Sequence, residues 1–389
     1  MICSLYIHIP FCKSKCEYCD FFSVPCGNKC IPDEYVDALV QELDFRINLY
    51  KVHQFSTVYI GGGTPSLLKI TQLEKIMQKV LSLGIPSEIT MEVNPEDVTE
   101  ELLIAMNDLG INRISCGIQA LNDEVLQSVK RRGCVESIFN KIELIKKSWN
   151  GIFSVDIISA LPNQKKLDFL DGLKKIVSFE PEHISMYALT IEESTPLGKK
   201  LQNGQISYDF EAADEMWIEG RDFLINSGYV HYEVSNFAKK GFDCEHNLVY
   251  WKLKNYIGIG AGAVGTIYSD RTIRWTNSTK LDLYISFWNK NLSDIKSDEL
   301  CNIQSVENID FNIQVFEYFM MGLRTSYGIC KEEFEARFNI PIPEKFIKIF
   351  NEWEQKQMCQ KRVSFNKTYY SLNSSGLLLL NEFLTELID

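Results

Sequence analysis

The stretch that decides the fold is Pro10-Phe11-Cys12-Lys13-Ser14-Lys15-Cys16-Glu17-Tyr18-Cys19-Asp20-Phe21. Its three cysteines, Cys12, Cys16 and Cys19, have the spacing C-x3-C-x2-C. Iron–sulfur clusters are normally held by four cysteines, so three thiolates leave one iron of a four-iron cube open to a small molecule. The alternative is structural zinc, which takes four protein ligands, and no partner pair follows at a suitable distance. The spacing therefore favours a [4Fe–4S] cluster with one open iron.

The composition narrows the class of protein. A chain of 389 residues with 45% hydrophobic and 24% charged residues is typical of a soluble globular protein with one large and one smaller domain. The net charge of -12 argues against nucleic acid as the main partner, because phosphate binding needs a basic face. No signal peptide and no run of about 18 apolar residues is found, so we expect no integral membrane segment. The 12 cysteines then fit a reducing cytoplasm, with at most transient contact at the membrane surface.

Short apolar runs alternate with amphipathic patterns, as in parallel βα units. The expected strands are Leu5–Ile9, Thr57–Ile60, Ile89–Val93, Arg113–Gly117, Ser154–Ile158 and His183–Leu189. Helical patterns lie between them, including Asp33–Tyr50 and Val135–Ser148, and a final apolar helix is expected over Ser374–Leu387. Thr71 and Thr99 are expected N-caps, and Gly84 and Gly110 are expected stops. Six strands are fewer than the eight of a TIM barrel, so the pattern predicts an α/β fold with an open, partial (β/α)6 barrel. We predict a barrel domain over 1–285 and a smaller, mainly helical domain over 286–389.

Polar and flexible residues follow the expected strands. The cysteine loop follows the first strand, Gly61-Gly62-Gly63 the second, Asn94-Pro95 the third and Gln119 the fourth. Parallel α/β folds bind ligands at the carboxyl ends of their strands. The glycines allow a ligand close to the backbone, although a plain turn is equally consistent, and the Gly-Lys-Ser/Thr ending of a P-loop is absent. The polar residues near strand ends are consistent with either ligand contacts or structural bridges: Glu92, Arg113, Gln119, Arg131 and Asp156.

The segment Cys244-Glu245-His246-Asn247-Leu248-Val249-Tyr250-Trp251 places one of only five histidines beside Asn, Tyr and Trp. A neutral imidazole can ligate haem iron, and aromatic rings can pack on a porphyrin. On composition alone, a packed or hydrogen-bonded structural histidine is favoured. The second C-x3-C pair, Cys26 and Cys30, is interpreted as ordinary thiols.

With these motifs in hand, the chain resembles the oxygen-independent coproporphyrinogen III oxidase family of radical S-adenosylmethionine (SAM) proteins. Within that family it is similar to the HemW haem-chaperone branch rather than to the oxidase HemN. The resemblance runs almost end to end and rests on these stretches: residues 6–12, 61–66, 112–119, 232–238, 246–251 and 318–324. It implies a [4Fe–4S] cluster on Cys12, Cys16 and Cys19, with SAM on the open iron.

The resemblance also implies which residues contact the two other cofactors. The positions matching SAM contacts are Tyr6, Tyr18, Gly62, Gly63, Thr64, Glu92, Gln119, Arg131, Asp156, Ala188 and Val264. The motif His246-Asn247-x-x-Tyr250-Trp251 matches the one associated with haem binding in the chaperone branch. This implication reverses the structural interpretation of His246 given above.

Two differences separate the chain from the oxidase. Phe21 stands where the oxidase has a further cysteine, and the oxidase's N-terminal extension is absent. One difference from the chaperone branch is Val264, where relatives typically carry His. The resemblance thus implies a haem chaperone that uses an electron donor for its cluster and hands haem to proteins such as respiratory cytochromes. The alternative is a coproporphyrinogen III oxidase that decarboxylates its substrate to protoporphyrinogen IX.

Overall fold

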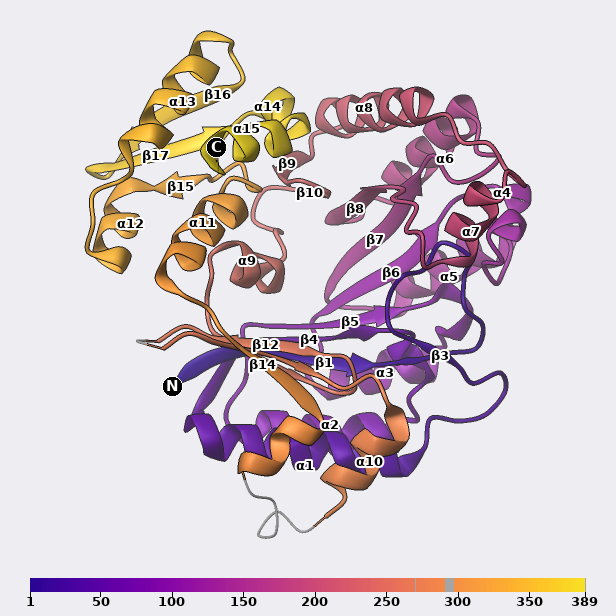
Figure 1. Ribbon diagram of the computed structural model, residues 1–389. Coiled ribbons are helices and arrows are strands. Elements are labelled where there is room, and N and C mark those ends of the chain that lie inside the picture. The colour runs from indigo at the N-terminus through magenta and orange to yellow at the C-terminus, as the bar shows by residue number, and fades with distance from the viewer. Residues whose placement is uncertain (270, 291–296, 389) are drawn as a thin grey trace.

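The computed structural model describes residues 1–269, 271–290 and 297–388. Its main feature is a curved sheet of twelve strands in the order β14-β13-β12-β11-β1-β4-β5-β6-β7-β8-β10-β9 (Figure 1). The six central strands are parallel and follow one another in chain order: β1 (Ile2–Ile9), β4 (Gln54–Gly62), β5 (Glu88–Val93), β6 (Arg113–Gln119), β7 (Ile152–Ser159) and β8 (His183–Ala188). Each is followed by a helical segment, which confirms the predicted partial (β/α)6 barrel.

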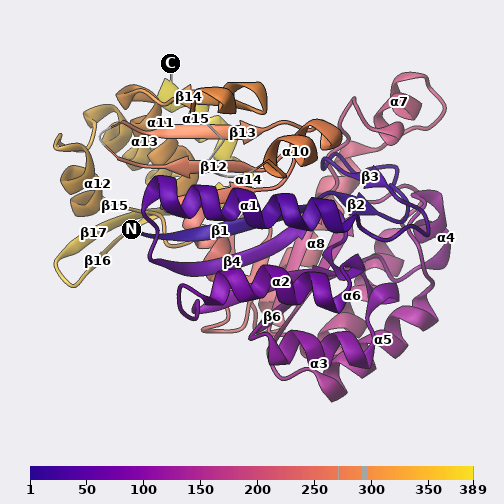
Figure 2. The same cartoon turned by 90° about the horizontal axis from the view of Figure 1, so that it is seen from below.

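Helices cover the outer face of these strands (Figures 1 and 2). They are α1 (Asp33–Tyr50), α2 (Ile70–Leu81), α3 (Glu100–Asp108), α4 (Asp123–Ser128), α5 (Val135–Ser148), α6 (Lys166–Ser178) and α8 (Phe210–Asn226). The short helix α7 (Pro196–Gln202) follows β8 and contacts the cysteine loop instead. Thr99 caps α3 as predicted, whereas Thr71 lies inside α2 because that helix begins one residue earlier. Gly84 and Gly110 end their helices with φ of +107° and +75°, the left-handed conformation that glycine adopts without strain.

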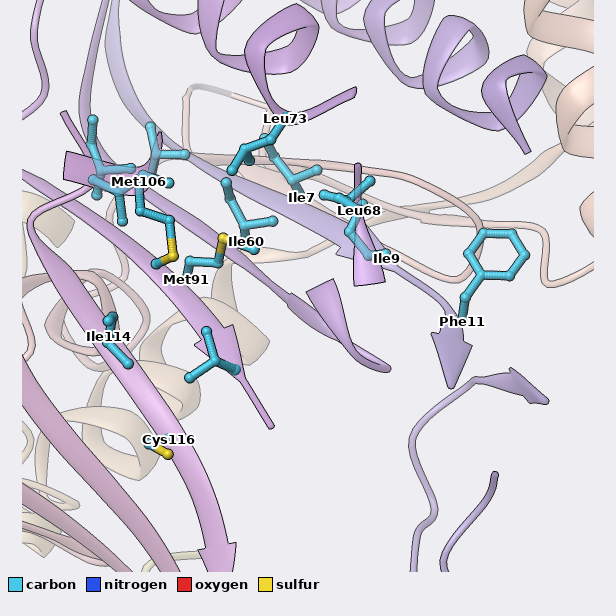
Figure 3. Packing of buried hydrophobic residues seen from close by; sticks show 14 of the residues in the cluster. Ile7, Ile9, Phe11, Ile60, Leu68, Leu73, Met91, Met106, Ile114 and Cys116 are labelled. Carbon is cyan, nitrogen blue, oxygen red and sulfur yellow. The ribbon is translucent and has the colours of Figure 1, made fainter. Parts of the chain in front are cut away.

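The two faces of the sheet differ in chemistry. On the outer face, Ile7, Ile60 and Met91 pack toward Leu73 of α2 and Met106 of α3, and all five are buried (Figure 3). On the inner face, polar side chains hydrogen-bond from strand to strand: Ser4 with Thr57, Tyr59 with Glu92, Ser115 with Asp156 and Ser154 with His183. Alternation along each strand therefore separates an apolar core under the helices from a polar barrel interior.

Further strands extend the sheet at both ends. On the β1 side they are β11 (Tyr256–Ile259), β12 (Val264–Ile267), β13 (Ile273–Asn277) and β14 (Gln304–Asn308), and on the β8 side β10 (Asn236–Ala238) and β9 (Val230–Glu233). The glycine-rich stretch 258–265, predicted as a loop or buried backbone, is the end of β11, a turn and the start of β12. The short helix α9 (Glu245–Trp251) packs against β4 and against α11 (Phe311–Gly322).

The C-terminal part has its own apolar core. It consists of α11, α12 (Lys331–Phe338), α13 (Glu344–Gln355), α14 (Ser374–Leu378), α15 (Leu380–Ile388) and a three-stranded sheet of β15 (Ile329–Cys330), β17 (Lys367–Leu372) and β16 (Cys359–Ser364). α10 (Leu281–Trp288) packs on α1, and β14 pairs with β13 in the large sheet. The domain division at 285/286 stays a prediction. Within the described residues, no helix has the length and apolar character needed to cross a bilayer.

Candidate active site: the cluster loop and the barrel mouth

The cysteine loop begins where β1 ends. β2 (Phe11–Cys12) pairs with β3 (Val24–Pro25), and the amides of Val24 and Cys26 donate to the carbonyls of Pro10 and Cys12, both at 2.7 Å. This short parallel pair closes the loop on itself. Cys12, Cys16 and Cys19 are all half-buried, and all three line one cavity at the barrel mouth. The loop therefore presents the predicted thiols to a common space.

Two of the three thiols have polar neighbours. The Thr64 hydroxyl donates to Cys12 Sγ at 3.5 Å, and the Arg131 guanidinium donates to Cys16 Sγ at 4.0 Å. Burial raises the pKa of the Cys19 thiol, and iron binding requires all three sulfurs as thiolates. Among the residues that the structure describes, no three His, Cys, Asp or Glu side chains converge as ligands of a single ion. A cube does not require that convergence, because each thiolate binds a different iron.

The cluster loop is anchored to the barrel through Glu17. This buried carboxylate pairs with Lys130 (3.0 Å) after α4 and with Lys200 on α7. The Glu17 backbone bonds in both directions, with its N–H donating to the Val129 carbonyl and its carbonyl accepting from Leu197 N–H. The loop is thus tied to two other βα connections, which fixes the position of the cysteines.

The cavity at the barrel mouth has a volume of about 360 Å³ and lies at the carboxyl ends of the parallel strands. It is lined by nine of the eleven residues predicted to contact SAM: Tyr18, Gly62, Gly63, Thr64, Glu92, Gln119, Arg131, Asp156 and Ala188. Residues from β4, β5, β6, β7 and β8 are thereby brought together with the cysteine loop. Their role as SAM contacts stays a prediction, but their convergence on one space is a property of the fold.

Glu92 is a carboxyl group of the cavity with a raised pKa. It accepts hydrogen bonds from Tyr59 OH at 2.9 Å and from the Gly62 amide at 3.0 Å, one on each oxygen. Burial, with a contribution from the nearby Asp156 carboxylate, raises the pKa of Glu92 to about 7. A cationic ligand would favour the ionised form of this group.

Asp156 and Arg131 lie on the other side of the cavity. The Ser115 hydroxyl donates to the Asp156 carboxylate, with Oγ 3.0 and 2.8 Å from its two oxygens, and burial raises the pKa of this carboxyl group. Arg131 donates to the Asn94 side chain and to the Gly117 carbonyl. Together with Glu92, Asp156 and the fixed guanidinium of Arg131 suit a ligand that carries both cationic and anionic groups.

Tyr6 lies on β1 outside the lining of the cavity. Its hydroxyl bonds to His8 Nδ1 at 2.8 Å, and His8 Nε2 bonds to the Phe22 carbonyl at 2.9 Å. A Cβ on Gly62, whose φ is +113°, would stand 2.5 Å from the His8 ring. His8 thus supports both the cysteine loop and the glycine loop. Sequence reasoning missed this residue, although its position near the end of the expected strand Leu5–Ile9, just before the cysteines, was a signal.

Val264 also lies outside the cavity lining. It is the first residue of β12, is half-buried, and pairs with Thr276 of β13. The predicted SAM contact of Val264 is untested, and so is the effect of valine in place of histidine. By contrast, Tyr59 lines the cavity and was not predicted.

The motif containing His246 lies on the short helix α9, outside the lining of the cavity. His246 is 0% exposed and does not line the cavity. Its Nδ1 bonds to Thr57 Oγ1 and its Nε2 to Tyr250 OH, both at 2.8 Å, and its ring lies 5.3 Å from that of Tyr59. Burial lowers the pKa of His246 to about 3, so the imidazole is neutral. In this arrangement both ring nitrogens are already hydrogen-bonded.

The rest of the motif is held by the barrel. Glu88 of β5 accepts from the amides of Glu245 (3.0 Å) and His246 (2.9 Å) at the start of α9. Asn247 and Trp251 are half-buried. The Trp251 indole nitrogen is buried and has no hydrogen-bond partner. The centre of the Trp251 ring lies 5.9 Å from Arg324 Cζ. The motif is therefore brought together by the fold, but not into the cavity that holds the cysteines.

Comparison with known proteins agrees with this architecture. Residues 6–176 match the model of the radical SAM superfamily, and residues 313–379 match the HemN C-terminal domain. The crystal structure of the Escherichia coli coproporphyrinogen III oxidase HemN has the same fold, with a TM-score of 0.80 at 20% identity over 99% of this chain and 89% of that one.

Curated relatives named "Heme chaperone HemW" align over nearly the whole length. The protein from Buchnera aphidicola subsp. Schizaphis graminum is 35% identical over 99% of this chain and 98% of its own. The protein from Lactococcus lactis is 31% identical over 97% of this chain and 95% of its own. The chain therefore belongs to the HemW family of radical SAM proteins.

Proposed function

We propose that this protein is a haem chaperone that carries a SAM-coordinated [4Fe–4S] cluster, binds haem and delivers it to haem proteins such as respiratory cytochromes. The observation that carries the proposal is the sequence similarity, 35% and 31% identity over 99% and 97% of this chain, to relatives named as haem chaperones. The cavity lined by the three cysteines and by Glu92 and Asp156, two half-buried acids with raised pKa, supports the cofactor part of the proposal.

The proposal assigns roles to the cysteines and to several other residues of the cavity. Cys12, Cys16 and Cys19 would hold the cluster, which supplies an open iron and one-electron chemistry when bound. Glu92 would accept a hydrogen bond from the amino group of SAM, and Arg131 would donate to the Cys16 sulfur. The backbone of Gly62 and Gly63 allows a ligand close to β4 because no side chain intervenes. An electron donor for the cluster is a required partner.

His246 remains the first candidate for the haem ligand, on family resemblance. Its burial and its two hydrogen bonds mean that α9 must move before the ring can reach an iron. The other histidines are His8, His53, His183 and His231, of which only His53 is exposed. His53 is therefore the second candidate, because it needs no rearrangement to bind haem.

The alternative function is that of the oxidase. The HemN-type C-terminal domain and the HemN fold are common to both candidates, so neither discriminates. Phe21 does favour the chaperone, since it is an exposed side chain without ligand capacity where the oxidase has a cysteine.

The test is a pair of assays on anaerobically reconstituted protein. Incubation with coproporphyrinogen III, SAM and a reductant should give no sustained protoporphyrinogen IX, whereas haem titration should give a saturable Soret band. Steady turnover would overturn the chaperone proposal. His246→Ala and His53→Ala then locate the ligand, with His183→Ala as a buried-histidine control. Loss of the band in only one of the first two variants identifies the ligand, and an unchanged band in His246→Ala refutes that assignment.

A further inference from the structure

The hairpin of β16 and β17 presents an unusual tip. The strands are joined by the two-residue turn Phe365-Asn366, with Ser364 paired to Lys367. Phe365 is 97% exposed, the largest value for any large hydrophobic side chain among the described residues, and Val363 beside it is 70% exposed. β16 is also the edge strand of its sheet. An apolar side chain gains nothing from such a position in water.

The backbone at the tip is unfavourable for phenylalanine. Phe365 has φ of +48° and Asn366 has φ of +58°, so both turn residues are left-handed. Two-residue hairpin turns of this kind prefer Asn-Gly or Asp-Gly, and a bulky side chain at positive φ is an outlier. Neither the turn nor the core therefore explains the presence of phenylalanine. Some contact outside the folded chain is the remaining physical reason.

The segment of the chain that forms the hairpin is basic, in an otherwise acidic protein. The chain has 52 acidic residues, but none lies between Gln355 and Asn381, a stretch that contains Lys356, Lys361, Arg362 and Lys367. Two of these cations are held against aromatic rings of the hairpin. Arg362 lies 4.8 Å from the Tyr369 ring centre, and Lys361 lies 5.8 Å from that of Tyr370. Lys367 is paired with Glu333 at 2.8 Å, and the carboxylates of Glu332 and Glu354 accept from the backbone amides of Thr368 and Lys361. The Lys361 and Arg362 side chains form no ion pair among the described residues and are the cations that the hairpin offers to a partner.

We propose that this hairpin docks the protein on an anionic lipid bilayer, with Phe365 and Val363 inserted at the interface and Lys361 and Arg362 on the headgroups. Aromatic and aliphatic side chains flanked by cations are the combination that such a surface attracts. A bilayer accepts a projecting finger without a complementary pocket. A stable protein partner would bury about 800 Å² on each side, more than the end of one hairpin offers.

The location of the hairpin is compatible with this role. Figures 1 and 2 both place its tip at the opposite end of the molecule from β2 and β3, where the cysteine loop lies. Docking through the tip therefore leaves the mouth of the cavity free. This inference goes beyond the proposed haem function and does not depend on it.

The test is flotation of the full-length protein with vesicles of phosphatidylcholine alone or with one quarter phosphatidylglycerol. The wild type should float with the anionic vesicles and not with the neutral ones. Phe365→Asn should weaken binding by about tenfold or more, since burial of one aromatic side chain is lost. Lys361→Gln/Arg362→Gln should weaken it by about fivefold for each charge, and salt should weaken the wild type similarly. Leu167→Asn, which removes a side chain 74% exposed on α6, is the control and should bind like the wild type.

The melting temperature of the variant distinguishes a docking role of Phe365 from a structural role. Asn tolerates the left-handed conformation better than Phe, so Phe365→Asn should melt at the same or a higher temperature while losing vesicle binding. A variant that melts lower and binds as before overturns the proposal. It is also overturned if the wild type does not float, floats equally with both vesicles, or floats only when a membrane protein is included, which would indicate a protein partner.

Discussion

Replacing Tyr59 with Phe should make SAM binding depend more steeply on pH. Tyr59 OH donates to Glu92 Oε1 at 2.9 Å, while the Gly62 amide occupies the other oxygen. A hydrogen bond to a charged group contributes about 1.5–3 kcal/mol, which is roughly one to two pKa units. The Tyr59→Phe variant loses this donor but keeps the ring that packs near Tyr6 and His246, at 6.3 and 5.3 Å between centroids.

The direction of the change in SAM affinity follows from the protonation state of Glu92 that binds SAM. The ionised carboxylate would accept hydrogen bonds from the amino group of SAM, and the pKa of Glu92, already raised by burial to about 7, should rise to about 8 or above without the tyrosine donor. At pH 7 the ionised fraction then falls from about one half to about one tenth, so SAM affinity should fall about fivefold. At pH 9 most of the affinity should return, because Glu92 is again ionised.

Anaerobic calorimetry at pH 7 and pH 9 measures this effect on reconstituted protein. Tyr256→Phe is the matched control, because it removes a barrel hydroxyl that accepts from Thr266 at 3.2 Å and does not line the cavity. Glu92→Gln should bind SAM weakly at both pH values, since it cannot ionise. The reasoning is refuted if Tyr59→Phe leaves the affinity unchanged, or lowers it equally at pH 7 and pH 9, which would mean that the hydroxyl does not act through Glu92.

Two further substitutions test the cluster and the junction of α1 with the extended sheet. Cys16→Ala removes one of three thiolates, so iron and acid-labile sulfide after reconstitution should fall well below the wild-type values, and retention of about four irons per chain would contradict the assignment. Arg46→Ala should lower the free energy of unfolding by about 3–5 kcal/mol in urea, because it leaves the buried Glu42 without its cation. Both side chains of that pair are 0% exposed and 3.0 Å apart, and a loss below about 1 kcal/mol would show that Asn277 and Tyr284 suffice as partners.

Local sequence patterns predicted the repeating architecture well. The helices at Asp33–Tyr50 and Val135–Ser148 and the parallel strands were visible because their apolar periodicity is local and is reinforced by packing on one continuous sheet. The predicted helix over Ser374–Leu387 was less accurate, since the structure divides it into α14 and α15 near Leu379. An apolar pattern does not reveal such a break, because the break depends on how the segment packs.

The sequence by itself determined the cysteine triplet and its position after the first strand. It also placed Gly62, Glu92 and Gln119 at or near the ends of strands, which meet at one edge because parallel strands end together. Only the tertiary structure decided that Tyr59 and His8 support that site and that His246 lies beneath it with both nitrogens bonded. His246 is separated from Thr57 by 189 positions, so no local pattern could reveal their contact. Hydrogen bonding of a buried imidazole depends on which distant groups the fold brings within reach, and that is a property of the packed barrel rather than of the motif.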